Sequence, residues 1–307
     1  MPKSVGESND LASLVTSRRK LMAGMGFSAL GWLGASALRA QSPLPEEPGE
    51  IDSGEEALTA NDINILNFAL NIEYLGAEFY LRAVTGSGLS ADDVTGQGNL
   101  GNVQGGSAVP FQNPRFRDYA EEIARNERAH VQFLRATLGE NAVARPEIDL
   151  QQGFTLAARA AGLIGPTQQF NPFANEVNFW LGAFMFEDVD VTAYKGAAPL
   201  LSERPIVEAA AGILAVEGYH AGLIRTVLYE LREHETTRAI SNLRDQADGF
   251  GDRDQPIRLQ AHANIVPTDG NGLAFSRTPQ QVLSIVYLGG EPNNFGFFPE
   301  RVNGAIR

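Results

Sequence analysis

The amino-acid sequence predicts an all-α protein: a four-helix bundle with a long crossover between its second and third helices, plus a C-terminal extension. Four long segments carry apolar side chains at helical spacing. Several of these segments begin and end with residues that are typical of helix N-termini and C-termini. The connection between the second and third segments is long enough to cross a bundle, whereas a brief turn joins the third and fourth. This combination favours a crossover topology over a simple up-and-down bundle.

The first two helices have clear start and stop signals. We expect the first to begin at the N-cap Thr59 and to end before Gly86. The second is expected to begin at Asn113-Pro114, an N-cap followed by proline at the first helical position, and to end at Gly139. Both segments therefore read as amphipathic helices.

The third and fourth helices have less sharply marked ends. The third is expected from about Ala174 to Lys195, with Gly196 as its stop, and the fourth from after Ser202 to about Glu233. The crossover before them, residues 139–173, contains a possible short helix at Phe154–Leu163. The bundle is thus predicted to occupy residues 58–234.

The remaining segment, residues 235–307, is expected to pack on the bundle as a C-terminal extension. Residues 236–247 have a helical pattern, and Thr278-Pro279 can start a helix that ends at Gly289. Apolar clusters in this segment favour packing over a free tail.

The N-terminal segment has the features of an export signal peptide. Residues 1–37 contain paired arginines, Arg18 and Arg19, before a moderately apolar run at Leu21–Leu38 that ends in a small-x-small cleavage pattern. This arrangement resembles a twin-arginine signal, which implies export of a folded protein to the periplasm or beyond. A single membrane anchor is the alternative, although the run is short and rich in glycine. Residues 38–57, with several prolines and acids, read as a linker.

Composition excludes several classes of function. The net charge is −13, which disfavours nucleic acid and anionic lipid as partners. We therefore expect no nucleic-acid partner and no membrane association after signal cleavage. Cysteine is absent, so disulfides, thiolate nucleophiles, iron–sulfur clusters and zinc–thiolate sites are ruled out. Any bound metal must be held by nitrogen and oxygen atoms.

Two Glu-x-x-His motifs stand on alternate predicted helices. Glu127 and His130 lie on the second helix, and Glu217 and His220 lie on the fourth. At this spacing both side chains project from one helical face and can bind one ion together. In each motif that face is otherwise apolar and points to the core, where an unpaired carboxylate is costly.

The other two helices each place a glutamate on an apolar face. Glu73 is the candidate on the first helix, with Glu78 as its competitor, and Glu187 is the candidate on the third, with Asp188 and Asp190 as competitors. One Glu from each of two helices plus one Glu-x-x-His from each of the others is the ligand set of ferritin-like di-metal proteins. The predicted ligands are Glu73, Glu127, His130, Glu187, Glu217 and His220.

These donors suit two ions of manganese or iron, because carboxylate and imidazole ligands without sulfur favour such metals. We expect Glu187 to serve in catalysis as well as in binding. Tyr194, which follows it on the same helix, is a candidate for a redox role or for contact with a ligand.

Several stretches resemble the desiccation-related ferritin-like proteins of bacteria and plants. They are Leu66–Leu75, Phe186–Val189, Tyr194–Pro199, Asn264–Asp269 and Phe275–Thr278. The resemblance covers most of residues 58–300, and it implies a ferritin-like fold and a link to stress or drying. It does not imply one reaction. Asn126 departs from the wider di-iron pattern, in which many relatives carry Asp before the Glu.

Three functions fit these features. The first is an oxidoreductase that acts on peroxide or oxygen, the second a ferroxidase or metal-binding protein, and the third a structural protectant with a non-catalytic site. Disproportionation of peroxide needs no electron donor, and a chain without cysteine carries no rubredoxin-like centre. We therefore favour manganese-catalase-like chemistry on a small-molecule substrate. A homo-oligomer is possible.

Overall fold

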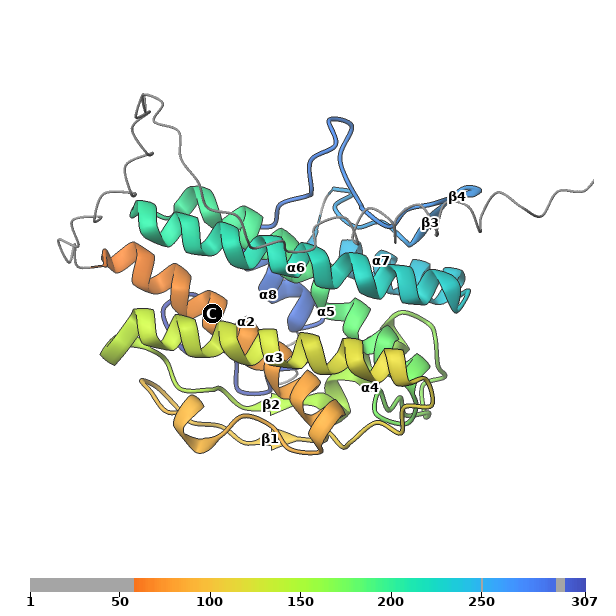
Figure 1. Cartoon of the computed structure of the whole chain (residues 1–307), viewed down its shortest axis with the longest axis horizontal. Helices are drawn as coiled ribbons and strands as arrows, with labels where there is room; N and C mark the ends of the chain where they lie inside the picture. Colours follow the sequence, from red (N-terminus) through yellow and green to blue (C-terminus); the bar gives the residue numbers. More distant parts are fainter. Residues whose placement is uncertain (1–57, 250, 291–295) are drawn as a thin grey trace, which may run out of the picture. The chain divides into compact units, whose positions relative to one another are not determined.

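The computed structural model describes residues 58–249, 251–290 and 296–307, and the predicted signal and linker lie outside this part. The described chain is mostly helical, which confirms the all-α prediction (Figure 1). Within these residues, no helix combines the length and the apolar character that crossing a bilayer requires.

Helices α2 (Ala60–Thr85) and α3 (Pro114–Leu138) form one packed pair. The Thr59 hydroxyl accepts a hydrogen bond from a backbone N–H of the first turn of α2, and Gly86 ends the helix with φ of 81°. At α3, Asn113 is the N-cap and proline takes the first helical position. The capping signals therefore predicted both helices correctly, because each signal satisfies local backbone groups.

Helices α5 (Glu176–Ala197) and α6 (Arg204–Glu230) form the second packed pair. The prediction that Gly196 stops α5 was wrong, because the helix continues through it. A Cβ atom at Gly196 would lie 1.9 Å from the carbonyl oxygen of Arg277. The glycine thus allows the backbone of the tail to lie close to α5. In the sequence, a glycine needed for such a close contact looks the same as a glycine that ends a helix.

The crossover contains α4 (Leu150–Ala160), which begins four residues before the predicted short helix. Its N-cap is Asp149, whose carboxylate accepts hydrogen bonds from the backbone of Gln151 and Gln152. Strand β1 (Val103–Gln104) pairs in parallel with β2 (Ile148–Asp149), so the glycine-rich loop after α2 is attached to the crossover. These strands were not predicted, because two residues are too few to show the alternation of apolar and polar side chains that indicates a strand.

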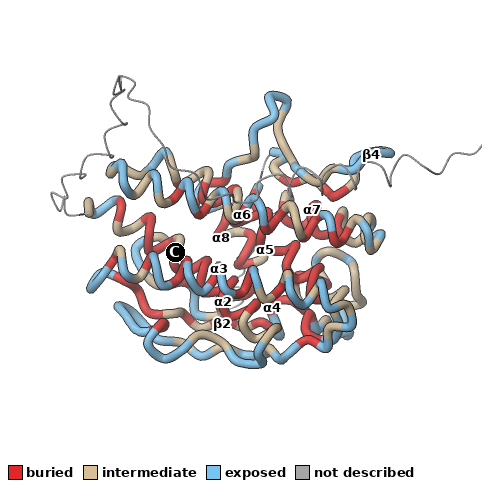
Figure 2. The backbone as a smooth tube through the Cα atoms, in the orientation of Figure 1, coloured by how far each residue is buried: buried red, intermediate tan, exposed pale blue. Residues whose placement is uncertain are grey.

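The core is continuous across both helix pairs, as the buried segments of Figure 2 show. Phe79 of α2 stacks on Phe179 of α5 with ring centroids 5.3 Å apart, and it meets the edge of Phe186 at 5.7 Å. Phe154 of α4 and Phe297 of the tail continue this aromatic cluster. The cluster therefore joins both helix pairs, the crossover and the tail in one hydrophobic core.

The tail contains α7 (His234–Asp248), the antiparallel strands β3 (Arg258–Leu259) and β4 (His262–Ala263), and α8 (Pro279–Val286). Helix α8 begins with a capping box formed by Thr278 and Gln281. Both α7 and α8 contact α5.

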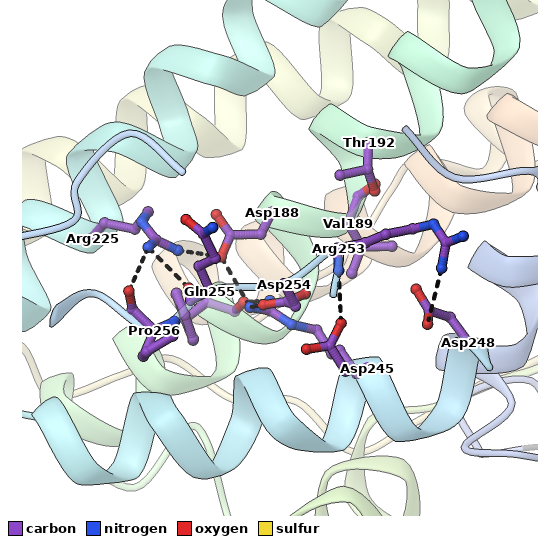
Figure 3. A network of polar contacts seen from close by, with 12 residues as sticks. Asp188, Val189, Thr192, Arg225, Asp245, Asp248, Arg253, Asp254, Gln255 and Pro256 are labelled. Carbon is purple, nitrogen blue, oxygen red and sulfur yellow. Dashed lines mark hydrogen bonds and ion pairs between the residues drawn. The ribbon is translucent and has the colours of Figure 1, made fainter. Parts of the chain in front are cut away.

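A buried network of arginines and aspartates joins the tail to α5 and α6 (Figure 3). Asp188 of α5 accepts hydrogen bonds from Arg225 of α6 at 2.7 Å and from Arg244 of α7 at 2.9 Å. Arg244 also donates to Asp254 at 2.6 Å, and Arg277 donates to the other oxygen of Asp254 at 3.1 Å. Every charge in these contacts has a partner of opposite sign, which is the condition for burying it.

Candidate metal centre

The four bundle helices bring all six predicted ligand side chains together in the core. Helix α2 contributes Glu73, α3 contributes Glu127 and His130, α5 contributes Glu187, and α6 contributes Glu217 and His220. All six residues are buried. The arrangement follows from sequence because each side chain occupies a core-facing position of its helix.

The donors form two groups, and within each group the ligand atoms lie within 4.8 Å of one another. Glu73 and His130 belong only to the first group, and Glu187 and His220 belong only to the second. Glu127 and Glu217 belong to both groups. The two Glu-x-x-His glutamates are therefore shared between the two groups, whereas each single glutamate belongs to one group.

Each imidazole turns its Nδ1 atom toward the carboxylates. The His130 Nδ1 lies 2.9 Å from Glu217 Oε1 and 3.3 Å from Glu73 Oε2. The His220 Nδ1 lies 3.4 Å from the nearest oxygens of Glu187 and Glu217. These are ion-pair distances, but the directions do not satisfy hydrogen-bond geometry.

Buried atoms without hydrogen-bond partners give a direct test of whether metal ions fit. In the described part of the chain, the atoms in question are Glu73 Oε2, Glu127 Oε1, both carboxylate oxygens of Glu187 and Glu217, and the Nδ1 atoms of His130 and His220. Leaving that many polar atoms unsatisfied in a core is very costly. Cations bound among them would satisfy these atoms together, and oxygen and imidazole donors suit manganese or iron. The residues therefore fit a two-metal centre.

The charges of the metal-free cluster depend on its members' mutual contacts. Burial raises the pKa of three of the glutamates, Glu73, Glu127 and Glu187, the last to about 7. Burial also opposes ionisation of Glu217, but its contacts with the two imidazoles lower its pKa to about 2. The carboxylates in turn outweigh burial at the imidazoles and raise the pKa of both, that of His130 to about 11. The metal-free cluster thus holds protons that bound cations would replace.

Two buried tyrosines stand beside the single glutamates. Tyr80 follows Glu73 by two helical turns on α2, and Tyr194 follows Glu187 by the same spacing on α5. The Tyr194 hydroxyl donates a hydrogen bond to Glu73 Oε1 across the bundle. Burial raises the pKa of Tyr80 and Tyr194 well above the usual value, and the neighbouring glutamates raise it further. Both phenols therefore stay protonated.

Two further residues lie next to predicted ligands. The side-chain amide of Asn126 lies 3.1 Å from Nε2 of His220. The contact is made by the amide nitrogen Nδ2, whose N–H group faces the imidazole edge that points away from the carboxylates. Gly76 makes room for a ligand, because a Cβ atom there would lie 2.2 Å from Glu127 Oε2. The glycine lies within a helix, and nothing in its sequence context marked this role.

The competing carboxylates lie outside both donor groups. Glu78 is paired with Arg82 at 2.9 Å and with Arg145 at 2.5 Å. Asp188 belongs to the arginine network on another face of α5. Asp190 is buried nearby, and burial followed by repulsion from Glu217 raises its pKa well above the usual value.

Comparisons with known proteins agree with this architecture. The chain is 29% identical over 275 residues to the desiccation-related protein PCC13-62 of Craterostigma plantagineum, covering 81% of this chain and 85% of that protein. It is 28% identical over 266 residues to the ferritin-like catalase Nec2 of Nesocodon mauritianus, covering 80% and 84%. The family model described as a ferritin-like domain matches residues 61–230, more than half of the chain. This chain therefore belongs to the ferritin-like domain family.

Proposed function

We propose that this chain is an exported di-metal oxidoreductase that disproportionates hydrogen peroxide in the manner of a manganese catalase. The observation that carries the proposal is the set of buried, unpartnered oxygen and nitrogen atoms from four helices. The absence of cysteine supports a reaction that needs no separate electron donor. A relative named as a ferritin-like catalase supports the same choice.

The overall reaction converts two molecules of hydrogen peroxide into one of oxygen and two of water. One peroxide is oxidised and gives up two electrons and two protons, and the other is reduced and takes them up. When bound, the two metal ions supply the store for those two electrons. The protein residues bind the ions, orient the ligands and carry protons.

Individual side chains have distinct roles in this proposal. The Tyr194 hydroxyl donates to Glu73 Oε1, so that Oε2, which has no hydrogen-bond partner, would be available to hold an ion. Glu187 Oε2 lies 3.4 Å from the Nδ1 atom of His220, on the side of the donor group, and Oε1 is left to accept a proton from peroxide. The six donor residues are buried within the hydrophobic core, which excludes bulk water and stray reductants.

Oxygen evolution tests the proposal. Metal-free protein reloaded with manganese should release oxygen from hydrogen peroxide without an added donor, and Glu187→Gln should fold but lose this activity. Glu122→Gln, an exposed change on α3, is the matched control and should retain it. If the manganese form releases no oxygen while the iron form rapidly oxidises ferrous ion, the chain is a ferroxidase. Inactivity of both metal-loaded forms would favour a structural protectant.

The proposal includes export in the folded state, because residues 1–37 resemble a twin-arginine signal. Replacing both Arg18 and Arg19 by lysine should leave the protein in the cytoplasm. The conservative change Lys3→Arg is the control and should not alter export. Normal export of the double variant would overturn the twin-arginine assignment.

A further inference from the structure

A cavity of about 270 Å³ lies apart from the metal centre, and no predicted ligand lines it. Its walls come from the loop at residues 105–107, the first turns of α4, and the segment at residues 169–173. This volume lies just below the roughly 300–1,000 Å³ of pockets that hold drug-sized ligands. The cavity therefore suits a small ligand of about one ring.

The lining of this cavity is polar but uncharged. Ser107, Gln151 and Gln169 line it as exposed residues, and within the described chain their side chains make no hydrogen bond to another residue. Asn171 uses its side-chain oxygen to accept from the backbone of Phe173, and its amide N–H groups remain available. Amide and hydroxyl groups that can both donate and accept thus converge on one space.

The cavity has apolar surface as well. Leu150 and Phe173 are buried in its wall, and Phe170 is half-buried beside them. A ligand with hydrogen-bonding groups at its edge and C–H groups on its faces would match both kinds of surface. An ionised ligand would find no charged residue in the lining to compensate its desolvation.

Internal contacts hold the walls in place without the ligand. The buried Thr155 hydroxyl donates to the carbonyl of Gln151 at 2.9 Å and contacts the backbone of Phe170 at 3.3 Å, which joins α4 to the 169–173 segment. Gly106 has a φ of 92°, and a Cβ atom there would lie 2.4 Å from Arg82 Cδ. The loop therefore depends on glycine to lie this close to α2, so the cavity is preformed.

We propose that this cavity binds a neutral polyhydroxylated molecule, a sugar of about one ring, through the amides of Gln151 and Gln169. Sugar hydroxyls both donate and accept hydrogen bonds, as these amides do, and a ring face suits the half-buried Phe170. The site is independent of the metal centre, and metal-free protein binds the sugar equally well.

The test uses the purified full chain with D-glucose as the probe, measured by calorimetry and by saturation-transfer NMR. Saturable binding is expected for wild type, and Gln151→Ala and Gln169→Ala should each weaken it by about five- to tenfold, the loss of one or two hydrogen bonds. Gln246→Ala is the matched control, because that glutamine is exposed on α7 and its side chain makes no hydrogen bond within the described residues. Glucose 6-phosphate should bind more weakly than glucose.

Three results would each overturn the proposal. These are an absence of saturable binding by wild type, unchanged affinity in both cavity variants, and equal weakening in the Gln246→Ala control. Tighter binding of glucose 6-phosphate would show that the site prefers an anion. None of these readouts depends on peroxide chemistry, so failure here is distinct from failure of the proposed function.

Discussion

One hydrogen bond at Glu73 determines which oxygen of a buried carboxylate remains free. Tyr194 occupies Oε1, and Oε2 is left beside the Nδ1 atom of His130 at 3.3 Å. At Glu127, the missing side chain of Gly76 plays a comparable part by leaving space for the carboxylate. The ligand positions thus depend on immediate neighbours as well as on the ligands themselves.

The histidines provide the sharpest test at the residue scale. His130→Ala and His220→Ala should each reduce bound metal from about two ions per chain to one or fewer, because each removes the nitrogen donor of one group. Elemental analysis of the purified proteins measures this directly. His262→Ala, an exposed change in β4, is the control and should leave metal content unchanged. Full occupancy in both site variants would refute the two-metal assignment.

Asp245 on α7 leads to a prediction about pH. Burial raises its pKa from 3.8 to about 6, and repulsion from Asp254, Asp252 and Asp248 adds to the effect. The folded state therefore holds this proton more tightly than the unfolded state, and the ionised carboxylate destabilises the fold as pH rises from about 4 through 6. Asp245→Asn should remove that penalty and still accept the hydrogen bond from the Arg253 backbone.

The gain in unfolding free energy for Asp245→Asn should be about 1 kcal/mol or less above pH 6, since solvent screens a half-exposed group. It should be much smaller near pH 4, where the carboxyl is protonated in the folded state and about half protonated in the unfolded state. Urea unfolding of metal-free protein at pH 4 and pH 7.5 measures the difference. Asp118→Asn, exposed on α3, controls for the general loss of negative charge. A gain of the same size at both pH values would contradict the assignment.

At the scale of elements, α5 supports two separate structures. Its core face contributes Glu187 and Tyr194 to the candidate metal centre, and Asp188 on another face belongs to the arginine network. Tyr194 of α5 donates to Glu73 of α2, and Tyr80 of α2 lies beside Glu187 of α5, so the two helices run antiparallel. The metal centre and the docking of the tail therefore share one helix.

Arg244 of α7 tests how strongly the tail is held. It is fully buried, bonds to Asp188, Asp254 and the Phe184 carbonyl, and stacks over the Phe184 ring at 4.4 Å. Arg244→Met should reduce the free energy of unfolding by about 3–5 kcal/mol, because it leaves buried carboxylates short of a partner. Chemical denaturation provides the measurement.

The matched control is Arg238→Met on the same helix, where the half-buried arginine lies 3.4 Å from the exposed Glu235. A surface pair contributes little, so this variant should lose less than about 1 kcal/mol. Equal losses in the two variants would show that the network around Arg244 contributes no more than a surface ion pair.

At the scale of the whole molecule, metal binding and folding are expected to be coupled. Four glutamates from four helices converge without enough internal partners, so the apo-protein retains an unfavourable cluster in its core. An ion that binds only the folded state, at one hundred times its dissociation constant, stabilises that state by about 2.7 kcal/mol. For a chain of this size that corresponds to a rise in melting temperature of roughly 5–10 °C.

Calorimetry of chelated protein, with and without added manganese or iron, measures this shift. The variant lacking both histidines, His130→Ala with His220→Ala, is the control and should melt at the same temperature in either condition. Magnesium should produce little change, because it disfavours imidazole ligands. A melting temperature of wild type that does not respond to manganese or iron would contradict the coupling.

Sequence alone determined the elements whose causes are local. Thr59 and Asn113 mark helix starts because a capping side chain satisfies neighbouring backbone groups. The convergence of the six carboxylate and imidazole side chains in the core was also predictable, since a charged residue on an apolar helical face is costly and therefore conspicuous. The sequence did not decide whether Glu187 or one of its acidic neighbours is the ligand, because successive helical residues differ in direction by only a fraction of a turn.

Only the tertiary structure decided the matters that depend on residues distant in the chain. It assigned Asp188 to the arginines, showed that Gly196 admits the Arg277 backbone, and placed Gly76 beside Glu127. It also distinguished the glutamates shared by two donor groups from those confined to one. Each of these outcomes rests on a contact between separate elements. Such contacts arise from packing in three dimensions, for which no spacing along a single helix provides a signal.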